Sequence, residues 1–216
     1  MRLQINKLQV AYGSRTVLRD IDLTLESGEV LTLCGRAGSG RSTLLKAVMG
    51  LVPVVSGTII VEDESGIHNF AAESVFQRVR QGIVWVPEIK ELFAGLTAEE
   101  NLLLALKASG LFSQNEWQVA LQAIYGRYPI LQTRAKVAAS VLSGGEQQLL
   151  AFARAALIAS KAQLLLLDEP AEGLAQNWVK QVEEHLKELK NAGKAILLVE
   201  QKMQISQMLG AKEFYL

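Results

Sequence analysis

Residues 30–49 read VLTLCGRAGSGRSTLLKAVM, and this stretch decides the fold. An apolar run over residues 30–34 is followed by a loop with glycines at positions 35, 38 and 40, and then by the apolar-periodic segment 44–49. This order predicts a buried strand, a glycine-rich loop and a helix. Glycines let successive backbone N–H groups curl around phosphate oxygens, and a helix N-terminus adds the positive end of its dipole. We therefore predict a phosphate-binding loop, with the hydroxyl of Ser42 available to Mg²⁺.

One residue departs from the usual form of such a loop, G-x-x-x-x-G-K-[ST], because Arg41 stands where lysine is expected. Lysine is a compact point charge that fits between the β- and γ-phosphates, whereas a guanidinium is planar and longer. We expect phosphate binding to survive this change and the alignment of the γ-phosphate for transfer to be impaired.

A second stretch carries paired carboxylates. Residues 164–170, LLLLDEP, predict a buried strand that delivers Asp168 and Glu169 at its C-terminal end. Active sites of open α/β sheets lie at that end of the strands. Asp168 is expected to hold Mg²⁺ directly or through water, and Glu169 to orient and polarise an attacking water.

The rest of the chain predicts an α/β fold around these two strands. Alternating apolar residues at 3–5 and 21–25 are typical of half-buried strands and predict an antiparallel β-layer at the N-terminus. The apolar run 195–199 predicts a third buried parallel strand. We expect one domain over residues 1–216, with a mainly parallel core sheet and no interdomain linker.

Helical patterns lie between the strands, and a helical subdomain is predicted at about 95–140 as an insertion in the core. Capping boxes at 97–100 and 143–146 mark two helix starts, because the first hydroxyl and the last carboxylate of each can satisfy orphan backbone N–H groups. His185 is interpreted as a surface residue on its helix rather than as a metal ligand.

Composition excludes several classes of protein. Lys and Arg number 22 and so do Asp and Glu, so no excess of positive charge draws the chain to nucleic acid or anionic lipid. The single cysteine, Cys34, excludes a disulfide framework and a cysteine-based zinc site. No stretch reaches the ~18 apolar residues needed to span a bilayer. We interpret the chain as cytoplasmic, with a membrane role only through docking onto another subunit.

Residues 142–148, LSGGEQQ, together with 168–170, resemble the signature of the ATP-binding-cassette (ABC) family, and the resemblance covers nearly the whole chain. It implies a P-loop NTPase fold of the ABC type. Physically the segment is a second phosphate cradle at a helix N-terminus. In the family this loop completes the nucleotide site of a second cassette in a head-to-tail dimer.

The resemblance also implies roles for single residues. Tyr12 matches the aromatic residue that stacks on adenine, Glu88 stands where a glutamine usually binds Mg²⁺ and water, and Gln201 stands where most cassettes have histidine. The implied catalytic residues are Glu169, Gln201 and Glu88, and the implied Mg²⁺ ligands are Ser42, Asp168 and Glu88. The implied ATP contacts are Tyr12, Gly35, Arg36, Ala37, Gly38, Ser39, Gly40, Arg41, Ser42, Thr43, Ser143, Gly144, Gly145 and Glu146.

Within the family, residues 86–88, 96–102 and 199–201 resemble import ATPases for urea and for branched-chain amino acids, with urea ranked slightly first. The resemblance implies a second ATPase subunit (identical or different), integral-membrane permeases and, indirectly, a substrate-binding protein, with the chain peripheral on the cytoplasmic face of the inner membrane.

Two other readings of the function stay open. A regulatory or dimer-completing subunit with weak hydrolysis is suggested by Arg41, Gln201 and the segment 171–172. A cassette acting on nucleic acid or ribosomes is less favoured, because such proteins usually carry two cassettes or a long coiled-coil insertion. We therefore expect no nucleic-acid partner.

Overall fold

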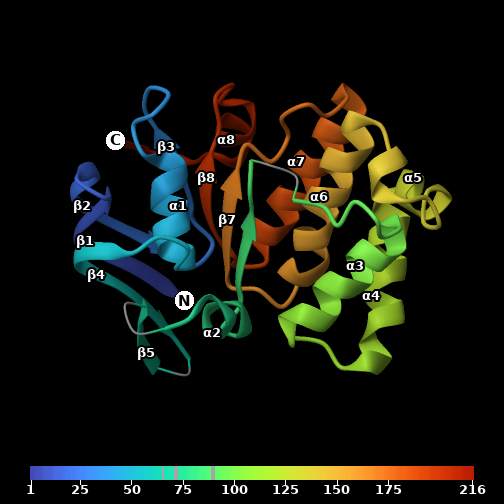
Figure 1. Cartoon of the computed structure of the whole chain (residues 1–216), viewed down its shortest axis with the longest axis horizontal. Coiled ribbons are helices and arrows are strands. Elements are labelled where there is room, and N and C mark those ends of the chain that lie inside the picture. Colours follow the sequence, from blue (N-terminus) through green and yellow to red (C-terminus); the bar gives the residue numbers. More distant parts are fainter. Residues whose placement is uncertain (65, 71–72, 89–90) are drawn as a thin grey trace.

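The computed structural model describes residues 1–64, 66–70, 73–88 and 91–216. Two sheets pack with the helix Arg41–Met49 between them, and most of the other helices lie beyond the second sheet (Figure 1). The first is antiparallel with the order β2-β1-β4-β5, and the second is parallel with the order β6-β7-β8-β3-β9. The strands are β1 Arg2–Tyr12, β2 Arg15–Glu26, β3 Val30–Cys34, β4 Val54–Asp63, β5 Gly66–Asn69, β6 Ile83–Val86, β7 Leu164–Asp168, β8 Ala195–Val199 and β9 Lys212–Tyr215. The α/β fold and the N-terminal antiparallel layer predicted from the sequence are confirmed.

The helices divide between the two halves of the molecule. They are α1 Arg41–Met49, α2 Val75–Arg80, α3 Ala98–Ser109, α4 Gln114–Arg127, α5 Pro129–Thr133, the 3₁₀ turn η2 Ala139–Val141, α6 Gly144–Ala159, α7 Gln176–Asn191 and α8 Gln204–Leu209. Figure 1 shows α3, α4 and α5 gathered beyond α6, away from the antiparallel sheet. They follow β6 and precede β7 in the chain, so the predicted segment at 95–140 is helical. In the described part of the chain, no helix is both long and apolar enough to cross a membrane.

Every residue of β3, β7 and β8 is buried, as their apolar runs predict. Alternate residues of β7 face two different cores. Leu164 and Leu166 pack with α1 and the antiparallel sheet, whereas Leu165 and Leu167 pack with α6 and the helical segment. Helices α1 and α6 therefore cover opposite faces of the parallel sheet, because successive side chains of a strand point to opposite faces.

Both predicted capping boxes are present, at Thr97 with Glu100 and at Ser143 with Glu146. The expected surface position of His185 is wrong in part, because the side chain is half-buried. Its Nδ1 lies 3.0 Å from the Tyr128 hydroxyl, and its ring lies 6.1 Å from that of Phe152. Position 185 falls three residues after Val182, on the apolar side of α7, so the helix turns this ring toward the core.

Candidate functional site

The glycine loop leaves the end of β3 and enters α1 at the C-terminal edge of the parallel sheet. Gly38 and Gly40 have φ angles of 81° and 105°, a region that side chains disfavour. A Cβ on Gly40 would also lie 2.6 Å from Leu18. The Leu44 N–H donates to the Gly40 carbonyl at 2.8 Å, so the helix begins directly after this glycine. The N–H groups of its first turn, residues 41–43, therefore have no intrahelical acceptor and are available to an anion.

Asp168 lies at the same edge, at the end of β7, and is 2% exposed. Burial raises the pKa of its carboxyl, the Ser42 hydroxyl opposes that rise through a hydrogen bond, and the charge of Glu88 adds to it. Its Oδ1 is buried and has no hydrogen-bond partner among the described residues. A buried carboxylate oxygen without a donor, next to a serine hydroxyl, is the donor set that a hard cation such as Mg²⁺ prefers.

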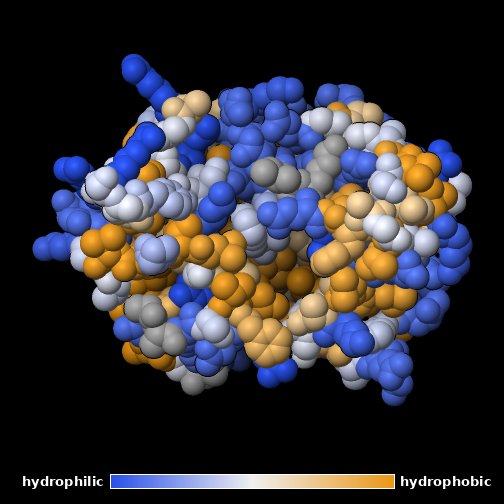
Figure 2. All heavy atoms as spheres, viewed as in Figure 1, coloured by the Kyte–Doolittle hydropathy of each residue, from blue (hydrophilic) through white to orange (hydrophobic). Residues whose placement is uncertain are grey.

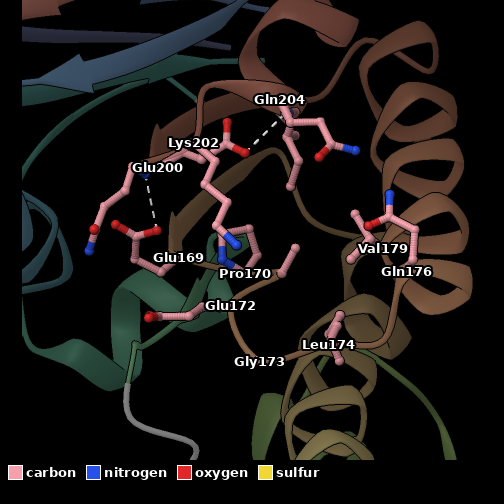
Figure 3. Close-up of a pocket in the computed structure, with 13 residues that line it drawn as sticks. Glu169, Pro170, Glu172, Gly173, Leu174, Gln176, Val179, Glu200, Lys202 and Gln204 are labelled. Atoms are coloured by element: carbon pink, nitrogen blue, oxygen red, sulfur yellow. Dashed lines mark hydrogen bonds between the residues drawn. The ribbon is translucent and has the colours of Figure 1, made fainter.

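Glu169, the next residue, is 8% exposed and has a φ of +50°, which is strained for a residue with a side chain. Its N–H donates to the Val199 carbonyl at 2.9 Å, and its Oε2 accepts from the Gln201 N–H at 3.2 Å, the bond that reaches Glu169 in Figure 3. Burial raises the pKa of the Glu169 carboxyl, and the Gln201 N–H opposes that rise. The carboxyl is thus held in place and is poised as a proton acceptor.

Several predicted residues meet at this edge. Arg41, Gly35, Ala37 and Gln201 line one hollow, and the charge of Arg41 acts on both Asp168 and Glu169. Glu88 is exposed, two residues beyond β6.

Tyr12 lies at the end of β1 and is 47% exposed, which leaves its ring face available to a planar ligand.

The predicted second cradle lies at the start of α6. Ser143 and Gly144 are exposed there, and a Cβ on Gly145 would lie 3.1 Å from the ring of Trp178. The Glu146 carboxylate accepts from the Ser143 N–H at 2.8 Å and from Arg134 at 2.9 Å. The Ser143 bond, with help from Arg134, lowers the pKa of Glu146. In this structure Glu146 thus holds the exposed residues Ser143 and Gly144 in place at the start of α6.

An apolar groove lies between α2, β6, α3 and α6, beside Glu88 and the helical segment, where the family resemblance leads us to expect a groove for membrane subunits. Its lining includes Phe76, Pro87, Ala105 and Ala151, with Arg154 at its side. Figure 2 shows an apolar depression at the centre of this face of the molecule. Pro87 adjoins Glu88, so the groove begins one residue from the predicted site.

Arg78 was not identified from the sequence. It is 5% exposed and donates from α2 to the carbonyls of Ala47 and Val48 at 3.0 and 2.7 Å, at the C-terminal end of α1. The contact joins residues some thirty positions apart, so no local pattern could reveal it.

Comparison with known proteins agrees with this geometry. The sequence matches the family profile described as ABC transporter over residues 18–172, which is most of the chain. The chain belongs to the ABC transporter family. The resemblance found in residues 142–148 and 168–170 is thereby confirmed.

Curated relatives in the family share about a third of their residues with this chain. The high-affinity branched-chain amino acid transport ATP-binding protein BraG of Pseudomonas aeruginosa is 36% identical over 200 residues, covering 92% of this chain and 82% of its own. The probable branched-chain amino acid transport ATP-binding protein LivF of Archaeoglobus fulgidus is 33% identical over 203 residues, covering 94% and 82%. The arginine transport ATP-binding protein ArtP of Haemophilus influenzae is 32% identical over 219 residues, covering 100% and 88%.

Solved structures give the same fold. A structure titled as the ATP-binding subunit of an ABC transporter superposes with a TM-score of 0.85 at 28% identity, covering 96% of this chain and 82% of its own.

Proposed function

We propose that this chain binds and hydrolyses ATP as the energising subunit of an ABC importer. The observation that carries the proposal is the meeting of the glycine loop, Asp168 and Glu169 at one edge of the parallel sheet. The N–H groups of the loop and of the first turn of α1 hold the phosphates. Ser42 and Asp168 would hold Mg²⁺, which would supply positive charge to the phosphate site.

Glu169 orients the attacking water and accepts its proton, since its raised pKa makes its carboxylate a stronger base than that of an exposed glutamate. Gln201 holds the carboxylate through its backbone N–H. Glu88 would add a further carboxylate to the Mg²⁺ site, and Tyr12 would stack on the adenine. These roles follow the family resemblance.

The site needs a second cassette. The glycine loop leads into α1 and the Ser143–Gly145 cradle begins α6, and these two helices cover opposite faces of the parallel sheet, so the two loops belong to different parts of one chain. A partner cassette, identical or different, supplies its own cradle to the ATP held by this loop. Solved cassettes of the same fold are described as dimeric, one of them bound to ADP and Pi.

We infer that the apolar groove receives a helix of an integral-membrane permease. It adjoins Glu88, so a movement of the groove reaches the cation site. The chain is then peripheral at the cytoplasmic face of the membrane and acts indirectly with a substrate-binding protein. BraG and LivF support branched-chain amino acids as the cargo in preference to urea.

Arg41 favours a second candidate, a dimer-completing subunit with weak hydrolysis of its own. The guanidinium stands where lysine aligns the phosphates, while Ser143 and Gly144 remain exposed for the site of a partner. In a mixed dimer such a chain completes a competent site on the other cassette.

Reconstitution tests the importer. The permease subunits of a branched-chain amino acid importer would be placed in vesicles with the wild-type chain or with Ala105→Arg, which puts a charge into the groove. We expect the variant to keep its own hydrolysis of ATP and to lose the transport and the permease complex. Transport at the wild-type rate by Ala105→Arg would contradict the docking role of the groove.

A further inference from the structure

Glu200, the first residue after β8, is only 8% exposed, and both oxygens of its carboxylate accept hydrogen bonds. Its Oε1 accepts from the Ile205 N–H at 3.0 Å, and its Oε2 accepts from the Ser206 N–H and the Ser206 hydroxyl, both at 3.0 Å. The Ser206 hydroxyl in turn accepts from the hydroxyl of Thr32 at 2.8 Å. Thr32 belongs to β3, the strand that leads into the glycine loop.

This network closes the turn that carries Gln201. The residues on either side of Glu200 both contact Glu169: the Val199 carbonyl accepts from its N–H, and the Gln201 N–H donates to its carboxylate. Figure 3 shows Glu200 and Glu169 on neighbouring stretches of chain along the wall of one pocket. The dashed lines mark one hydrogen bond accepted by Glu169 and one accepted by Glu200 from the start of α8.

The turn after β8 is strained at Met203, the neighbouring Glu169 after β7 is strained as well, and both conformations need outside support. Glu169 has a φ of +50° and Met203 has a φ of +55°, and each costs on the order of 1–3 kcal/mol for a residue with a side chain. Such conformations persist only where surrounding contacts over-determine them. Bonds to a charged acceptor are the strong ones in proteins, and the Glu200 carboxylate accepts three.

We propose that Glu200 is a positioning residue for hydrolysis: it locks the turn after β8 so that the Gln201 backbone N–H holds the Glu169 carboxylate. The proposal rests on the proposed role of Glu169 with the attacking water. A histidine side chain is not needed for this contact, because the backbone N–H makes it. Through Ser206 and Thr32 the turn is also tied by hydrogen bonds to the strand that leads into the glycine loop.

The variant Glu200→Gln keeps the shape of the side chain and removes its charge. Glu183→Gln is the matched control, because the Glu183 carboxylate accepts from the side chain of Gln204 on the same turn at 2.6 Å and touches neither Gln201 nor Glu169 by hydrogen bond. We expect kcat for ATP to fall about tenfold or more in Glu200→Gln, with the Kd for Mg-ATP within about threefold, and no such fall in the control. An unchanged kcat in Glu200→Gln would overturn the proposal.

A double-mutant cycle separates positioning from general damage. If Glu200 acts through Glu169, adding Glu200→Gln to Glu169→Gln should lower the residual rate by less than about twofold. The same tenfold loss in both backgrounds would show that Glu200 does not act through Glu169. Ser206→Ala keeps the two backbone N–H bonds to Glu200 and removes the hydroxyl bond, so it should give a smaller loss in kcat. This variant replaces Glu200→Gln as the test if Glu200→Gln folds poorly.

Amide hydrogen exchange of Gln201, followed by NMR, tests the same contact without ATP. We expect its exchange to be at least about tenfold faster in Glu200→Gln than in the wild type, and unchanged in Glu183→Gln. If the wild-type chain hydrolysed no ATP, the proposed function would be contradicted, whereas the exchange measurement would still test the role of Glu200 because it needs no ATP. Equal exchange rates of Gln201 in wild type and Glu200→Gln would overturn the role of Glu200.

Discussion

His185 makes the stability of the fold depend on pH in a window that the structure defines. Its ring is packed against Tyr128 of the helical segment and Phe152 of α6, and burial lowers its pKa to about 4, with the nearby Arg127 charge acting in the same direction and Glu188 opposing it. The ordinary value is 6.5. The unfolded chain therefore binds a proton at a higher pH than the folded chain does.

The direction of the effect follows from this difference. Above about pH 7.5 the ring is almost entirely neutral in both states and contributes almost no pH dependence. As the pH falls toward 4 the unfolded state is increasingly favoured, because only there is the ring protonated. At pH 5 the loss in free energy of unfolding is about 2 kcal/mol, which follows from 1.36 kcal/mol per pKa unit and partial titration.

Urea denaturation at pH 7.5 and pH 5.0 measures this loss in the wild type and in His185→Gln. Glutamine keeps a polar partner for the Tyr128 hydroxyl and has no charge to gain. Other groups titrate alike in both proteins, so the difference between their two losses isolates the imidazole. We expect the wild type to lose about 2 kcal/mol more than the variant. Equal losses, or an imidazole that titrates above pH 6 in the folded chain, would refute the reasoning.

Two further predictions concern cationic side chains at the two ends of α1. Arg41→Lys should raise kcat for ATP and leave the Kd for Mg-ATP within a few-fold, because both side chains attract phosphate and only the transition state demands the tighter geometry. Steady-state kinetics measure kcat and calorimetry measures Kd. An unchanged kcat would show that the loop accommodates arginine. Arg78→Met should lower the free energy of unfolding by about 3 kcal/mol in urea titrations, because the carbonyls at the C-terminal end of α1 lose the guanidinium that donates to them. Arg78→Lys should lower the free energy of unfolding by less. A loss below about 0.5 kcal/mol in Arg78→Met would contradict that role.

Local patterns in the sequence predicted much of this fold. The buried strands β3, β7 and β8 followed from their unbroken apolar runs, and the capping boxes at Thr97 and Ser143 followed from a spacing of three residues. In each case the interacting groups are near one another in the chain, so that composition and spacing suffice.

Contacts between distant segments could not be predicted in this way. The bond between Thr32 and Ser206 spans 174 positions, and that between Tyr128 and His185 spans 57. The environment of His185 depends on which element packs over α7, and the engagement of Glu200 depends on the turn that follows β8. Neither leaves a periodic signal in the sequence, although the apolar neighbours of His185 on α7 give a partial one.

Steady-state hydrolysis of Mg-ATP by the purified chain and by Glu169→Gln is the most direct measurement of the proposed chemistry. We predict measurable turnover by the wild type, a loss of at least about a hundredfold in the variant, and binding of Mg-ATP by both. Equal rates of hydrolysis in the two proteins would contradict the role of Glu169, and failure of both to bind Mg-ATP at millimolar concentration would contradict the nucleotide site itself.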